Sequence, residues 1–174
     1  MQYLVCALYR FVRVENPEAW RDPILEICKE EQVKGTLLLA REGINGTIAG
    51  SEAGMRKVLS FLRALPGLAE LEHKESWAEA VPFLRMKVKL KKEIVTMGVP
   101  EIDPSQHAGI YVQPQDWNAL ISDPDVLLVD TRNEYEVRVG SFDGAVNPHI
   151  DKFTEFPEWI QSEENRQGKK KIAM

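Results

Sequence analysis

The order of strand and helix patterns between residues 3 and 95 constrains the fold of this chain more than any other feature. Segments rich in β-formers and aromatics alternate with two amphipathic helical segments. We expect strands at residues 3–12, 33–41, 46–50, 71–77 and 85–95, with one helix after the first strand and another after the third. Two crossover helices around a central hairpin predict an α+β, ferredoxin-like arrangement, with both helices on one face of an antiparallel sheet.

Both predicted helices have start signals. Asn16 is a suitable N-cap for the first helix, with Pro17 at its first position, and Ser51 is a suitable N-cap for the second. The second helix should bury a stripe at helical spacing. That stripe consists of Met55, Val58, Leu59 and Leu62.

Asn45-Gly46 predicts the turn of the central hairpin, because a two-residue turn needs positive φ at both positions. Arg41 and Glu42 would lie beside this turn, whose geometry explains neither charge. We therefore treat Arg41 and Glu42 as candidates for a substrate-facing, RNA-binding role.

A segment with Pro100, Pro104 and no hydrophobic period follows the last of these strands. It is typical of a linker. We expect a first domain at residues 1–98, a linker at 99–109 and a second domain at 110–174.

The second domain begins as an α/β domain. The apolar run at residues 125–130 is typical of a buried parallel strand, and helices are expected at 133–139 and 156–162. Residues 169–174 begin another strand. Because the sequence stops inside this element, we expect the second domain to be incomplete.

The net charge of −5 is unevenly distributed. Residues 1–100 hold 15 Lys and Arg against 13 Asp and Glu, whereas residues 101–174 hold 7 against 14. Only the first part offers a net basic surface, and four cations alternate with apolar residues there: Arg85, Lys87, Lys89 and Lys91. On a strand they would share one face, spaced roughly 6–7 Å apart like phosphates along a nucleic-acid strand. The alternatives are a solvated sheet face or lysines that protect an edge strand.

Other residue types restrict the class of protein. Cys6 and Cys28 lie within apolar patterns, which favours reduced core thiols in a cytoplasmic protein. There is no signal-peptide pattern and no apolar run long enough for a membrane span. The three histidines share no metal-ligand spacing, so we expect no metal site and no evident cofactor.

Long blocks of the chain resemble the rhodanese-related tRNA uridine hydroxylases. These blocks are residues 35–37, 40–47, 83–89, 91–98, 111–112 and 116–118. Residues 129–136 and 140–148 resemble the entry half of a rhodanese domain, in which a strand ends in Asp-x-Arg. The resemblance implies an acylphosphatase-like first domain, a partial rhodanese-like second domain, and oxygen-dependent 5-hydroxylation of the wobble uridine of tRNA.

The same resemblance implies tRNA as partner, molecular oxygen as co-substrate and a reactive cysteine that would follow Met174. The present chain would then be inactive. Asp130 and Arg132 lie at the carboxyl end of a strand, where sites form in such sheets, and are supporting candidates. The simpler interpretation is that Asp130 caps the next helix and Arg132 pairs with a carboxylate.

Three other functions compete with RNA modification. A rhodanese-type sulfurtransferase fits the second domain equally well but does not need a basic strand. A non-catalytic rhodanese-like binding module would lack the cysteine altogether. An acylphosphatase-type hydrolase is disfavoured, because residues 9–14 after the first strand contain no glycine to form a phosphate cradle.

Overall fold

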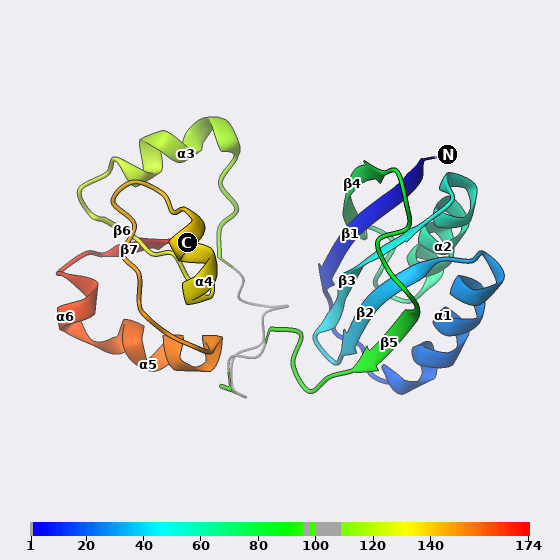
Figure 1. Cartoon of the computed structure of the whole chain (residues 1–174). Coiled ribbons are helices and arrows are strands. Elements are labelled where there is room, and N and C mark those ends of the chain that lie inside the picture. The colour runs from blue at the N-terminus through cyan, green and yellow to red at the C-terminus, as the bar shows by residue number, and fades with distance from the viewer. Residues whose placement is uncertain (1, 96–97, 100–108) are drawn as a thin grey trace. The chain divides into compact units, whose positions relative to one another are not determined.

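The computed structural model describes residues 2–95, 98–99 and 109–174, which belong to two compact units (Figure 1). Among the described residues, the first unit holds 2–95 and the second holds 98–99 and 109–174. The predicted linker, residues 99–109, lies almost entirely outside the described residues. No helix in the described parts is long and apolar enough to span a membrane.

The first unit is a five-stranded sheet with two helices on one face (Figure 1). Its elements are β1 Tyr3–Phe11, α1 Glu18–Glu30, β2 Lys34–Ala40, β3 Gly43–Gly50, α2 Glu52–Ala64, β4 Glu72–Ala78 and β5 Met86–Leu90. The strand order is β4-β1-β3-β2-β5, antiparallel except for the β2–β5 pair. The predicted ferredoxin-like, acylphosphatase-like topology is therefore confirmed.

The core of this unit lies between the sheet and the two helices. The predicted stripe of α2 is fully buried there, and the Ser51 hydroxyl accepts a hydrogen bond from the Gly54 N–H at 3.2 Å, as an N-cap does. The Asn16 side chain accepts from the Ala19 N–H at 3.3 Å, although α1 begins at Glu18. Cys6 and Cys28 are buried free thiols, as predicted.

The predicted position of the central turn is wrong. Ala40 pairs with Gly43, so the two-residue turn is Arg41-Glu42, and Asn45-Gly46 lies inside β3. The glycine at position 46 is needed for close strand packing, because a Cβ there would lie 2.1 Å from the Thr36 carbonyl oxygen.

The last strand is shorter than predicted. Only Met86–Leu90 is strand, which leaves Arg85 and Lys91 just outside it. Both still hydrogen-bond to β2 through their backbones: the Gly35 N–H donates to the Arg85 carbonyl at 3.2 Å, and the Lys91 N–H donates to the Leu39 carbonyl at 2.8 Å. The cationic segment therefore follows the sheet edge along its whole length.

The second unit is small and mostly helical. Its elements are α3 Pro114–Ile121, β6 Val126–Leu128, α4 Glu134–Val139, the 3-10 helix η1 Phe153–Glu155, α5 Phe156–Gln161, α6 Glu163–Arg166 and β7 Lys171–Ala173. β6 and β7 pair in parallel, and Val129 forms a parallel bridge with Val146. The two predicted strands are thus present but shorter than the predicted 125–130 and 169–174, whereas a rhodanese-like fold stays a prediction.

Candidate functional site

The cations of β5 lie on an edge strand, on the sheet face opposite the helices. Lys87 pairs with Thr36 and Lys89 with Leu38, whereas Val88 between them is buried in the core. Because side chains alternate between faces along a strand, both lysines point away from α1 and α2. Lys87 is half-buried and Lys89 exposed. The predicted alternation is present, and an edge position also fits protection against strand pairing.

Arg41 and Glu42 form the hairpin turn itself. The Glu42 carboxylate accepts the Ile94 N–H at 2.8 Å and so ties down the segment after β5. The backbone carbonyl of Glu42 accepts the Val12 N–H at 2.9 Å. Glu42 therefore has a structural role that the sequence did not reveal, whereas Arg41 is exposed at the turn.

Asp130 and Arg132 form one polar cluster at the carboxyl end of β6. Arg132 donates to both carboxylate oxygens of Asp130, Nε to Oδ1 at 2.9 Å and Nη2 to Oδ2 at 2.6 Å. The Ser141 hydroxyl donates to Asp130 Oδ2 at 2.8 Å, and Arg132 Nη2 also donates to the Gly140 carbonyl at 2.6 Å. The cluster thus joins the strand end to the turn after α4.

The charges of this cluster are strongly coupled. Asp130 is only 7% exposed. The Arg132 guanidinium, helped by Ser141, holds the pKa of Asp130 well below its usual range despite the opposing effect of burial. Arg132 therefore pairs with a carboxylate, as the simpler interpretation expected. Asp130 does not cap α4: the N-cap is Asn133, whose backbone N–H donates to the Glu136 carboxylate at 3.2 Å.

A second polar cluster surrounds Glu134 at the start of α4. Glu134 Oε2 accepts from the Asn147 side chain at 2.9 Å and lies 3.3 Å from His149 Nδ1. Hydrogen bonding to Asn147 lowers the pKa of Glu134. A shallow depression of about 430 Å³ adjoins this cluster. Its lining consists of Asn133, Glu134, Tyr135, Arg138 and Asp151.

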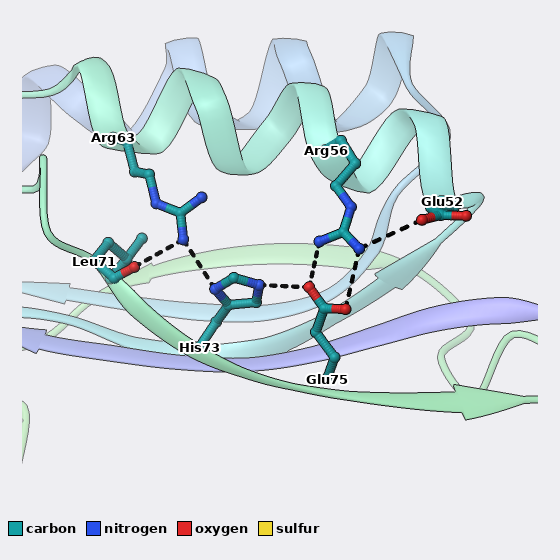
Figure 2. Close-up of polar contacts among 6 residues, drawn as sticks. All are labelled: Glu52, Arg56, Arg63, Leu71, His73 and Glu75. Carbon is teal, nitrogen blue, oxygen red and sulfur yellow. Dashed lines mark hydrogen bonds and ion pairs between the residues drawn. The ribbon is translucent and has the colours of Figure 1, made fainter.

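Sequence reasoning missed a network that joins α2 to β4 (Figure 2). Arg56 binds both carboxylate oxygens of Glu75 and lies 3.4 Å from Glu52. His73 bridges Glu75 and Arg63, with Nε2 2.7 Å from Glu75 Oε1 and Nδ1 2.9 Å from Arg63 Nη2. Two signals were available: Arg56 and Arg63 are two helical turns apart on one face, and His73 and Glu75 alternate on one strand.

Beneath this network lies the buried thiol of Cys6. Among the described residues, Cys6, His73 and Glu75 bring three potential metal ligand atoms within 4.8 Å of one another. Arg63 can only donate, so His73 Nδ1 accepts and Nε2 carries the proton given to Glu75. Burial raises the pKa of Cys6 to about 11. A metal would have to displace these bonds and a thiol proton, so the arrangement is better suited to holding β4 against α2.

The first unit matches a known protein family. The family model described as the UPF0176 acylphosphatase-like domain matches residues 3–94. Among solved structures, an acylphosphatase from Coxiella burnetii is similar at 14% identity with a TM-score of 0.36, over 51% of this chain and 93% of that one. Full-length HypF in its phosphate- and nucleotide-bound form is similar at 14% identity with a TM-score of 0.38, over 54% of this chain and 12% of that one.

Curated relatives cover both units. A tRNA uridine(34) hydroxylase of Agrobacterium fabrum is 59% identical over 99% of this chain and 55% of its own length. Proteins of the same name from Gluconobacter oxydans and Caulobacter vibrioides are 61% and 60% identical over 90% and 91% of this chain, and over 50% of their own lengths. The chain thus spans about half the length of the curated relatives it matches.

Proposed function

Since this chain belongs to the UPF0176 acylphosphatase-like domain family, we propose that the full-length protein hydroxylates uridine 34 of tRNA, with molecular oxygen as co-substrate. The observation that carries the proposal is the identity of 59–61% with three proteins named tRNA uridine(34) hydroxylase, which extends through both units. Identity at this level across both units favours a shared activity.

In this proposal the first unit contributes affinity for tRNA. Lys87 and Lys89 face away from the helices, and Arg85 and Lys91 continue the same edge through their backbone bonds to β2. Four cations in a row suit a phosphate backbone. The exposed Arg41 lies at the turn between β2 and β3 and would extend this basic edge.

The second unit would contribute positioning residues. Asp130 fixes the direction of the Arg132 guanidinium by two hydrogen bonds, and Arg132 in turn holds the Gly140 carbonyl. We assign Asp130 and Arg132 the role of ordering the strand end and the following turn beside a reactive loop.

Neither cysteine of this chain suits a nucleophilic role. Cys6 and Cys28 have no exposed surface, and burial raises the pKa of their thiols to about 11 and about 12. The thiolate is the reactive form, so both are inert at neutral pH. The reactive cysteine implied by the resemblance would therefore lie outside residues 1–174.

The test uses the full-length natural gene product and unmodified tRNA. Nucleoside mass spectrometry should show 5-hydroxyuridine at position 34 only when oxygen is supplied, and isotopically labelled oxygen gas should enter the product. Sulfur transfer from thiosulfate without hydroxylation would instead establish a sulfurtransferase. RNA binding without either reaction would establish a binding module.

A further inference from the structure

Two aromatic side chains lie on the sheet face that has neither of the unit's helices. Leu4, Cys6 and Leu8 of β1 are buried in the core, so the alternate residues Tyr9 and Phe11 point to the opposite face. Both are half-buried, and their ring centroids are 6.3 Å apart with planes inclined at 69°. β1 is an inner strand of the sheet, between β4 and β3, so the rings lie within the face rather than at its rim.

The neighbours of these rings on β3 are small or polar. Tyr9 pairs with Asn45 and Phe11 with Gly43, which has no side chain. The next residues along the same face of these strands are Ala7 and Thr47, paired with each other.

Cations flank the aromatic pair on both edges of the same face. Lys74 of the edge strand β4 pairs with Ala7. Lys87 and Lys89 lie on β5 at the other edge. Lys34 of β2 pairs with Ala49 and shares this face, and the one acidic strand residue there is Glu72, opposite Tyr9. Among the described strand residues, this face thus carries four lysines and one carboxylate.

The spacing suits a short stretch of nucleic acid. Neighbouring strands are about 4.8 Å apart, so β4 and β5 are separated by roughly 19 Å, or about three phosphate spacings at roughly 6–7 Å each. Aromatic rings on an open sheet that stack two or three bases are a recurrent mode of single-strand recognition. Because the two rings are inclined at 69°, bases stacked on both cannot be parallel, which favours a splayed single strand over a duplex.

We propose that this helix-free sheet face binds two or three unpaired RNA nucleotides, with bases on Tyr9 and Phe11 and phosphates at the flanking lysines. The inference rests on the proposed function and deepens it, since it names the RNA class: a single-stranded loop rather than a helical stem. It also extends the interface from the β5 edge to the middle of the sheet.

The test measures binding of a fluorescent single-stranded RNA of about eight nucleotides to this chain by anisotropy, across a series of salt concentrations. Tyr9→Leu/Phe11→Leu keeps apolar side chains but removes both ring faces. We expect it to weaken binding roughly 10-fold or more. The slope of log affinity against log salt should not change, because no phosphate contact is lost. The same RNA in a duplex should bind more weakly to the unaltered chain.

Two variants separate stacking from misfolding. Tyr9→Phe keeps the ring and should bind more tightly than Tyr9→Leu, which removes it. Trp77→Leu removes a more exposed aromatic, 49% exposed, that lies on the helix side of β4 opposite Leu4, and it should leave affinity unchanged. Equal affinities for all variants, or equal loss in Trp77→Leu, would overturn the proposal.

The same substitutions in the full-length protein distinguish the two levels of inference. If Tyr9→Leu/Phe11→Leu hydroxylates tRNA with an unchanged KM, the sheet face is not the RNA surface, although the proposed function stands. If the unaltered full-length protein hydroxylates nothing while single-strand binding needs both rings, the hydroxylase proposal fails and the RNA surface stands.

Discussion

Glu75 Oε1 lies 2.7 Å from His73 Nε2, while the same carboxylate binds Arg56 of the facing helix through both oxygens. Arg56 and then His73 lower the pKa of Glu75 to about 2. An acid with a depressed pKa in the folded state stabilises the fold above its unfolded pKa, and this contribution is lost as pH falls through the folded value. We therefore expect the free energy of unfolding to decline between about pH 4.5 and pH 2 partly through Glu75.

Replacing Glu75 by Gln should remove that part of the pH dependence. At pH 7 the variant should melt at a lower temperature, and its stability should vary less between pH 4.5 and 2. Thermal unfolding followed by circular dichroism across this range measures both effects. The matched control is Glu72→Gln on the same strand, which points to the other face. A pH profile of Glu75→Gln that parallels the unaltered chain would show that the network is not formed in solution.

The position of Gly46 inside β3 yields a stability prediction. A Cβ at Gly46 would lie 2.1 Å from the Thr36 carbonyl oxygen, on backbone that cannot move without disturbing the β2–β3 pairing. Gly46→Ala should therefore cost about 2–4 kcal/mol, measured by urea unfolding. Gly140→Ala, where a Cβ would meet nothing within 4 Å, should change stability little. If alanine is tolerated at position 46, the β2–β3 register is wrong, and a turn at Asn45-Gly46, as the sequence suggests, is favoured.

This position also shows where sequence patterns are and are not sufficient. The Ser51 cap and the stripe of α2 depend on residues within one helix, and local spacing predicts them. The role of Gly46 depends on a neighbouring strand that approaches from elsewhere in the chain, so local turn chemistry gave the wrong answer. The ferredoxin-like order was predictable because it needs only the sequence of element types.

Site residues divide in the same way. The alternation of Lys87 and Lys89 is a local pattern, so it could be seen in the sequence. The contact between Arg56 and Glu75 joins residues 19 positions apart on different elements and could not be predicted from it. The bond from Glu42 to the Ile94 N–H spans 52 positions and could be found only in three dimensions. Patterns of one element therefore predict which face a side chain takes but not its partner in another element.

The Asp130–Arg132 pair predicts local order in the second unit. The Asp130 side chain holds Ser141 and the Arg132 side chain holds the Gly140 carbonyl. Asp130→Asn would weaken the bond to Arg132 and so loosen the Gly140–Ser141 turn. Because Arg132 is partly exposed, the cost should be moderate, about 1–3 kcal/mol. Amide hydrogen exchange should rise at residues 140–142. Arg138→Gln, which removes a largely exposed partner of Glu134, should leave that exchange unchanged.

The buried thiols predict chemical inertness. With pKa values of about 11 and 12 and no exposed surface, Cys6 and Cys28 should react slowly with a disulfide reagent at pH 8 and rapidly after unfolding in guanidinium. The chain of residues 1–174 should accordingly transfer no sulfur from thiosulfate and hydroxylate no tRNA. Turnover in either assay that is abolished by Cys6→Ser or Cys28→Ser would show that a thiol of this chain reaches substrate.

The basic edge gives the sharpest separation between an RNA enzyme and a plain sulfurtransferase. If Lys87 and Lys89 both touch phosphates, replacing them by Gln should flatten the slope of log tRNA affinity against log salt by about 1–2 units. Stability should change little, since surface lysines contribute little to folding. The matched control is Lys29→Gln/Lys57→Gln, on α1 and α2 and thus on the opposite face of the sheet. The control removes the same charge, so a general field effect would flatten both slopes equally. An unchanged slope in Lys87→Gln/Lys89→Gln would assign these residues to edge protection alone.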